Sequence, residues 1–152
     1  MGQHLRDKEV AGTRPAIVVD ASVLVKWFVE EEFSQEALRL RAAHLSLETR
    51  IVVPSLARYE VLNALKYSAR LGTEDLVRAS KDLEAAELIE ISPDGEVWEK
   101  MLRIAAEHGL TVYDSAYLAL GFAKKLEVYT ADEKMLETSG ALDYVRHLRT
   151  VR

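Results

Sequence analysis

Short runs of β-branched residues alternate along this chain with longer stretches in which apolar residues recur every three or four positions. Short apolar runs are typical of strands, and the longer periodic stretches are typical of helices. The runs predict strands at 17–19, 51–53, 88–91, 127–130 and 144–148. The periodic stretches predict helices at 22–28, 34–47, 55–71, 73–86, 97–108 and 113–124. Strands that alternate with helices indicate a mostly parallel sheet with helices on both faces, which is a three-layer α/β/α sandwich.

Capping residues mark the ends of several predicted helices. Ser55 follows Pro54 and is predicted to be the N-cap of the helix that runs to Leu71. Gly72 is predicted to end that helix, and Gly109 is predicted to end the helix at 97–108. No repeat or linker interrupts the series of strands and helices.

The chain has the length of one compact domain. It has 152 residues, of which 49% are apolar, and this suits a single core. We predict one domain at 15–152, preceded by a flexible polar tail at 1–14. No run approaches the ~18 apolar residues of a membrane-spanning helix, and the N-terminus lacks the apolar core of a signal peptide. We therefore expect a soluble, cytoplasmic protein.

Composition restricts the kind of metal site that this chain can build. There is no cysteine, which excludes disulfides and thiolate ligands. The histidines form no ligand-spaced pair, so carboxylate oxygens are the plentiful ligands, and these suit Mg²⁺, Mn²⁺ or Ca²⁺. A net charge of −5 argues against binding nucleic acid through a broadly basic surface. It leaves room for a nuclease with an acidic, metal-neutralised site.

Four acidic residues lie within or beside apolar segments, where a lone carboxylate is costly. Asp20 follows the first strand directly, and Asp132 lies just past the fourth. Asp114 is in the first turn of a very apolar helix, and Glu60 lies within another. If the sheet is doubly wound, the loops after the first and fourth strands are neighbours at its switch point. We therefore expect the four carboxylates to line one cleft.

Each acid also has a plain structural interpretation. Asp20 and Asp114 suit helix N-termini, where a carboxylate caps free N–H groups. Thr130 and Glu133 match a capping box, which would make Asp132 part of an ordinary helix start. Glu60 would belong to a solvated stripe with its neighbours on the helix, Asn63 and Lys66. Alternatively, Asn63 shares a helix face with Glu60 and hydrogen-bonds either its carboxylate or a nearby phosphate.

The segments that carry these acids resemble, in order and spacing, the PIN-domain ribonucleases, and above all the VapC-type toxins of prokaryotic toxin–antitoxin pairs. The matching segments are 18–27, 59–65, 111–120 and 130–132. The resemblance covers roughly residues 16–150. It implies a five-stranded sheet in the order 3-2-1-4-5 and a Mg²⁺- or Mn²⁺-dependent endoribonuclease. It also implies a homodimer and inhibition by a cognate VapB-like antitoxin.

The resemblance also implies roles for individual residues. Asp20 and Asp114 match the family's most direct metal ligands, Glu60 and Asp132 match its remaining acidic positions, and Ser22 and Thr130 match its supporting hydroxyls. From the chemistry of hydrolysis, we further expect Asp132 to complete the metal shell or help to hold a second ion, and Glu60 to orient or deprotonate the attacking water. Cations on the elements that carry the acids either contact RNA or lie solvated on the surface: Arg58, Lys66 and Lys26.

Other functions are compatible with a layered α/β fold and an acidic cleft. A PIN-like module that binds without cleaving is the main alternative, and the intact acids argue against it. Receiver domains need an acidic pair after the first strand, but Ala21 follows Asp20. Phosphatases of the haloacid dehalogenase type need a second Asp where this chain has Ser22. For an antitoxin, the helices at 33–47 and 73–86 are the predicted borders of its groove.

Overall fold

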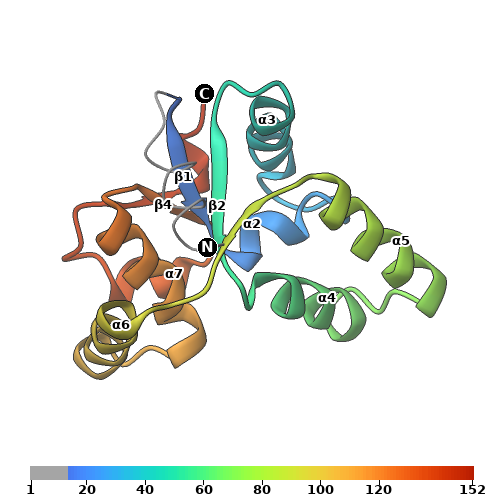
Figure 1. Cartoon of the computed structure of the whole chain (residues 1–152). Coiled ribbons are helices and arrows are strands. Elements are labelled where there is room, and N and C mark those ends of the chain that lie inside the picture. The colour runs from blue at the N-terminus through green and yellow to red at the C-terminus, as the bar shows by residue number, and fades with distance from the viewer. Residues whose placement is uncertain (1–13) are drawn as a thin grey trace.

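The computed structural model describes residues 14–152, which form a parallel five-stranded sheet between layers of helices (Figure 1). The strands are β1 (Ala16–Val19), β2 (Arg50–Pro54), β3 (Ile89–Ile91), β4 (Val128–Thr130) and β5 (Val145–His147). Their order in the sheet is β3-β2-β1-β4-β5, and each neighbouring pair is parallel. The predicted fold class and strand order are confirmed.

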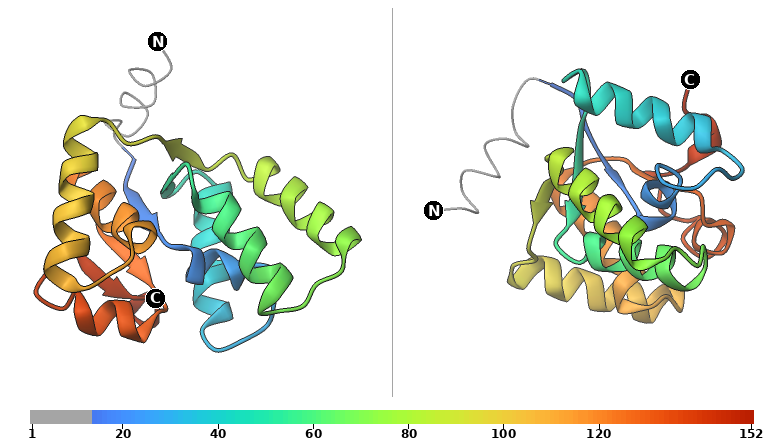
Figure 2. Two further views of the ribbon diagram at one scale, coloured as in Figure 1. Left: turned by 90° about the horizontal axis from the view of Figure 1, so that it is seen from below. Right: turned by 90° about the vertical axis from the view of Figure 1, so that its right-hand side faces the viewer.

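Helices cover both faces of the sheet and its carboxyl-terminal edge. They are α2 (Ala21–Val25), α3 (Ser34–Leu45), α4 (Ala57–Tyr67), α5 (Thr73–Ala85), α6 (Gly95–His108), α7 (Val112–Lys124) and α8 (Glu133–Thr138), followed by the 3-10 turn η1 (Leu148–Thr150). The α6–α7 pair lies on one side of the sheet and α3 on the other (Figure 1). Seen from below, α2 lies between α7 and the α4–α5 pair (Figure 2).

A central part of the core lies where α7 packs on β1 and β2. Residues 115–121 of this helix are all buried, and they lie against β1 and β2, whose inner residues Val18, Val19 and Val52 are fully buried. On the opposite face of the sheet, the buried His44 of α3 bonds to β2 and to the end of α5. The Ile51 N–H donates to His44 Nδ1 at 3.0 Å, while His44 Nε2 lies 2.8 Å from the Ala86 carbonyl.

Two predicted helix boundaries are wrong, because sheet pairing and chain geometry override local capping preference. Ser55 does not cap α4, whose N-cap is Leu56. The Ser55 N–H instead donates to the Ile91 carbonyl at 3.0 Å, which prolongs the β2–β3 pairing. Gly72 does not end α4, because it is the extended N-cap of α5, and Arg70 takes the left-handed conformation. Gly109 does end α6, with φ at 62°.

The predicted tail at 1–14 lies almost wholly outside the described residues, which begin at Arg14. Arg14 itself is attached to the domain, because its carbonyl accepts a hydrogen bond of 2.7 Å from Arg50 Nη2. Among residues 14–152, every helix falls short of the length and apolar character that a membrane span requires.

Gly121 lies where α7 packs tightly against β4, and it gives a test of this packing. A Cβ at this position would lie 2.3 Å from Val128 Cγ2 and 3.0 Å from the Leu126 carbonyl oxygen. We expect Gly121→Ala to lower the free energy of unfolding by about 1–3 kcal/mol in urea, although alanine favours helices. Gly95→Ala is the control, because nothing lies within 4 Å of its Cβ. Equal stability of the two variants would contradict this packing.

Candidate functional site

All four acids predicted from the sequence line one cleft at the carboxyl-terminal edge of the sheet. The cleft has a volume of about 460 Å³. Asp20 enters it from the end of β1, Glu60 from α4, Asp114 from α7 and Asp132 from the loop after β4. These are the elements that surround α2 in the view from below (Figure 2). The doubly wound topology thus brings together residues that lie more than a hundred positions apart.

Asp20 is the most deeply placed of these acids, with 4% of its surface exposed. Its Oδ1 accepts hydrogen bonds from the Ser22 hydroxyl and the Val23 N–H, and its Oδ2 accepts one from the Thr130 hydroxyl. Burial raises the pKa of Asp20 to about 6, although these three donors oppose the shift, and the charge of Asp114 adds to it. Asp20 is both a helix cap, as one interpretation predicted, and part of the cleft.

The hydroxyls of Ser22 and Thr130 join the two strand ends through Asp20. Ser22 Oγ accepts a hydrogen bond of 2.9 Å from the Ala131 N–H, and Thr130 Oγ1 accepts one of 3.0 Å from the Asp132 N–H. Each hydroxyl then directs its own proton to the Asp20 carboxylate. The loop after β4 is therefore fixed relative to the end of β1, and both hydroxyls support the acids directly.

Asp132 caps α8, but not through the predicted capping box. Its own Oδ1 accepts a hydrogen bond of 3.1 Å from the Met135 N–H. The Thr130 hydroxyl is turned to Asp20, so Thr130 is not the N-cap and the capping-box interpretation is wrong. The Asp132 side chain also lines the cleft. Capping and facing the cleft are compatible, because the Met135 bond uses only one of the two carboxylate oxygens.

Asp114 does not cap α7, so the capping interpretation is wrong for this residue. The N-cap is Thr111, whose hydroxyl accepts a hydrogen bond of 3.0 Å from the Asp114 N–H. The carboxylate is thus left to face the cleft. Burial, and then the charge of Asp132, raise the pKa of Asp114, while Thr111 and Lys134 oppose the shift. Asp114 also raises the pKa of Glu60 and of Asp20, which makes it the electrostatic centre of the cleft.

Glu60 is supported by Tyr117, a residue that the sequence did not single out. The Tyr117 hydroxyl donates to Glu60 Oε1 at 2.7 Å. This bond lowers the pKa of Glu60, but burial has the larger effect and raises it. The predicted partner, Asn63, is exposed and lies outside the cleft lining, so its proposed bond to Glu60 is wrong. In the sequence, Tyr117 is indistinguishable from a core aromatic.

Of the three cations predicted to contact RNA, only Lys26 lies in the cleft. It is 9% exposed, and its Nζ lies 2.9 Å from Glu31 Oε1. Arg58 lines a separate groove, where its Nη2 is 3.8 Å from Glu90 Oε1. Lys66 lies over the ring of the adjacent Tyr67, 5.0 Å from its centroid. The cleft therefore has an excess of negative charge, and its one lining cation is already paired among the described residues.

The four carboxylates line the same cleft, but their side chains do not converge on one position. Within residues 14–152, no three acidic or imidazole groups are close enough together to form a direct metal cage. Their mutual repulsion and burial nevertheless favour a bound cation. All the available ligand atoms are hard oxygens, which suit a divalent ion that keeps part of its water shell.

This sheet order, with acids gathered at the ends of β1 and β4, defines the class of protein. The chain belongs to the PIN-domain family, whose sequence model matches residues 17–141. Among curated proteins it is similar to "Ribonuclease VapC3" of Pyrobaculum aerophilum, with 35% identity over 130 residues that span 83% of this chain and 96% of that protein.

Two further relatives extend this comparison. "Exonuclease VapC9" of the same organism is 35% identical over 124 residues, which span 76% of this chain and 90% of that protein. A chain in the structure of a toxin–antitoxin complex from Klebsiella pneumoniae shares the fold with a TM-score of 0.65 and 16% identity. That match covers 87% of this chain and 97% of the other.

Proposed function

We propose that this protein is a Mg²⁺- or Mn²⁺-dependent endoribonuclease and the toxin of a prokaryotic toxin–antitoxin pair. The observation that carries the proposal is the gathering of Asp20, Glu60, Asp114 and Asp132 in one cleft. The similarity to a protein named as a ribonuclease supports RNA as the substrate.

Asp20, Asp114 and Asp132 would hold the divalent ion. Burial and repulsion raise the pKa of Asp20 and of Asp114, so a cation held by these carboxylates would relieve an unfavourable charge distribution. Because Mg²⁺ keeps several waters, these side chains need not all contact it directly. When bound, the ion supplies a water of lowered pKa and stabilises negative charge on the leaving oxygen.

The side chains divide the remaining work of phosphodiester hydrolysis. Glu60 accepts a proton from the attacking water, whose oxygen forms a bond to phosphorus. The bond from phosphorus to a ribose oxygen breaks, and that oxygen takes up a proton from solvent water, while Glu60 returns its proton to solvent. Lys26 lies in the cleft, where it can exchange Glu31 for a substrate phosphate. Arg58 and Lys66 lie outside the cleft and would contact more distant parts of the RNA.

Cleavage of a circular single-stranded RNA tests this activity, because an exonuclease cannot cut a circle. We expect linear products with Mg²⁺ or Mn²⁺ and none with EDTA. Ca²⁺ is the control ion, since its larger radius and looser coordination make it a poor substitute. Digestion of linear RNA alone would contradict endonuclease action. Cleavage undiminished by EDTA would contradict metal dependence.

A binding module without catalysis is the second candidate. Its support is that no three acids form a direct metal cage within the described part of the chain. Calorimetric titration with Mn²⁺ distinguishes the two. Heat of binding that disappears in the Asp114→Asn variant supports the nuclease, whereas no binding by the wild-type protein supports the silent module.

The proposed regulator is a VapB-like antitoxin, and the likeness to a chain of a toxin–antitoxin complex supports it. The antitoxin would lie along α3 and α5, whose ends are joined by the bond between His44 and the Ala86 carbonyl. Leu38 and Val77 expose apolar surface on these helices. Growth arrest on expression, relieved by a neighbouring small reading frame, is the expected result. Relief that survives charged substitutions at both residues would exclude this surface.

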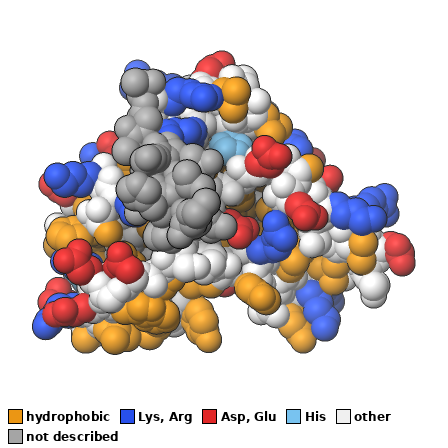
Figure 3. Space-filling model, viewed as in Figure 1, with side chains coloured by type: hydrophobic (Ala, Val, Ile, Leu, Met, Phe, Trp, Pro, Cys, Tyr) orange, Lys and Arg blue, Asp and Glu red, His pale blue; other side chains and the backbone are white. Residues whose placement is uncertain are grey.

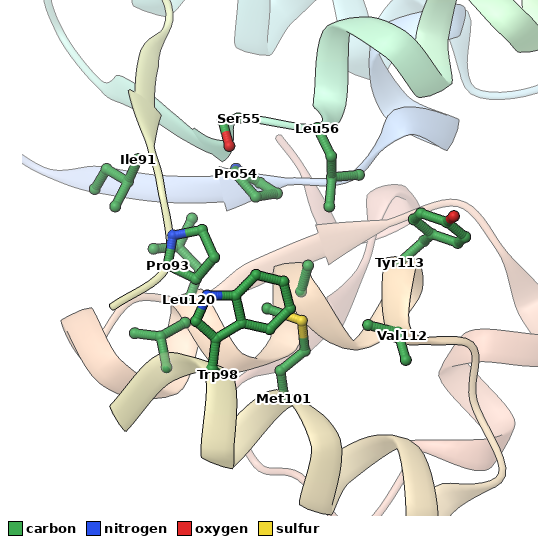
Figure 4. Close-up of a pocket in the computed structure, with 12 residues that line it drawn as sticks. Pro54, Ser55, Leu56, Ile91, Pro93, Trp98, Met101, Val112, Tyr113 and Leu120 are labelled. Carbon is green, nitrogen blue, oxygen red and sulfur yellow. The ribbon is translucent and has the colours of Figure 1, made fainter. Parts of the chain in front are cut away.

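An apolar face on α6 and the start of α7 supports a homodimer. Hydrophobic side chains gather along the lower edge of the molecule over α6 and α4 (Figure 3). Here Trp98, Met101, Leu56 and Tyr113 surround a cavity of about 230 Å³ (Figure 4). Trp98 is 48% exposed and Tyr113 is 64% exposed. Contiguous exposed apolar surface of this kind marks protein interfaces, and we propose a second copy as its partner.

Trp98→Glu tests this interface. We expect the variant to be monomeric in analytical ultracentrifugation at concentrations where the wild-type protein is dimeric, because a charge is costly in an apolar contact. Tyr67→Glu is the control, since Tyr67 is also an exposed aromatic residue (66%, against 48% for Trp98) but lies at the carboxyl end of α4, outside the lining of this cavity. A dimer that persists in Trp98→Glu would exclude this face.

A further inference from the structure

We propose that Tyr117 is a positioning residue that fixes the catalytic orientation of Glu60. This inference rests on the proposed nuclease function and adds a residue to its machinery. Tyr117 lines the cleft, yet only 1% of its surface is exposed. Its hydroxyl spans the gap between α7 and α4 and donates to Glu60 Oε1 at 2.7 Å.

Tyr117 is well suited to hold another side chain still. It is three residues after Asp114 on α7, so the two lie on neighbouring positions of one helix face. The helix around it is buried from Ser115 to Gly121, and this packing leaves the ring little freedom. Burial and the charges of Glu60, Asp20 and Asp114 raise the pKa of Tyr117. The hydroxyl therefore remains a donor over the whole working range of pH.

Glu60 needs such a partner, because its side chain is long and partly exposed. A free glutamate samples several rotamers, and fixing it costs conformational entropy. The bond from Tyr117 holds Oε1 against α7 and leaves Oε2 to accept the proton of the attacking water. Geometry of this kind contributes to the rate by orienting the reacting groups.

The competing explanation is that a buried hydroxyl simply needs an acceptor and that Glu60 is the one at hand. The two explanations differ in their kinetic consequences. A positioning role affects turnover and acts only through Glu60. A purely structural role affects stability, and any loss of activity would be independent of the side chain at position 60.

Tyr117→Phe keeps the ring and removes the donor. Because hydrogen bonds to charged groups are strong, we expect kcat for RNA cleavage to fall about 10- to 100-fold, with KM nearly unchanged. Tyr144→Phe is the matched control: it removes a hydroxyl that donates to the Leu118 carbonyl of the same helix at 3.0 Å, outside the cleft lining. We expect this control to keep the wild-type kcat.

A double-mutant cycle with Glu60→Asp decides whether Tyr117 acts through Glu60. Asp is one methylene shorter and loses the 2.7 Å bond while keeping a carboxylate. We expect Tyr117→Phe to cause little further loss in that background. Additive losses, an unchanged kcat in Tyr117→Phe, or an equal loss in Tyr144→Phe would overturn the role of Tyr117 in an active enzyme. An inactive wild-type protein would instead overturn the proposed nuclease function itself.

Discussion

Replacing Asp114 with Asn is expected to abolish RNA cleavage while leaving the fold intact. Removing a proposed direct metal ligand should cost more than the roughly 10- to 100-fold loss that follows removal of an outer-shell partner. The Asp114 N–H bond to Thr111 uses only the backbone of residue 114 and survives the change. Asp114 is also the acid whose charge raises the pKa of both Asp20 and Glu60.

The stability of this variant distinguishes a damaged site from a damaged fold. Removing the charge of Asp114 relieves repulsion, so we expect the metal-free variant to unfold at the same urea concentration as the wild-type protein or a higher one. Asp82→Asn is the control, because it neutralises an exposed acid on α5. Wild-type cleavage by Asp114→Asn would contradict the proposed mechanism. Marked destabilisation would contradict the electrostatic description of the cleft.

Asp20→Asn is expected to abolish cleavage as well, again by more than about 100-fold, and also to change how stability depends on pH. The folded pKa of Asp20 is about 6, against an ordinary value of 3.8. Because the folded pKa is raised, ionisation of this carboxyl increasingly opposes folding as pH rises above 3.8, and fully so above about 6. Its full cost is about 3 kcal/mol. Most of this cost disappears as pH falls from about 7 to 4.

Asparagine carries no charge at either pH, so the variant lacks this contribution. Measured in EDTA, the stability of Asp20→Asn relative to the wild-type protein should fall by about 2 to 2.5 kcal/mol between pH 7 and pH 4, because most of the cost is lost in that range. The comparison cancels the contributions of the other acids. Parallel stability curves for the two proteins would show that Asp20 titrates normally and is not held in a buried, hydrogen-bonded site.

The acids themselves were predictable from the sequence for a physical reason. A carboxylate directly after a β-branched run, as at Asp20, must lie at a strand end, and parallel strand ends meet at one edge of a sheet. The same argument placed Asp132 opposite it. Helix boundaries were less predictable where a sheet hydrogen bond competes with a helix cap. At Ser55, the bond to the Ile91 carbonyl replaced the helix cap that local preference favours.

The alternation of strands and helices, the parallel sheet and the four acids follow from the amino-acid sequence, because hydrophobic periodicity and strand-end position are local properties. The partners of the acids depend on the folded arrangement. Thr130 bonds to Asp20 across 110 positions, and Tyr117 bonds to Glu60 across 57. Such contacts depend on how helices pack across the sheet, and no periodicity along the chain encodes them. The same packing left Asn63 outside the cleft, whereas Asp114 is released from capping by a local neighbour, Thr111.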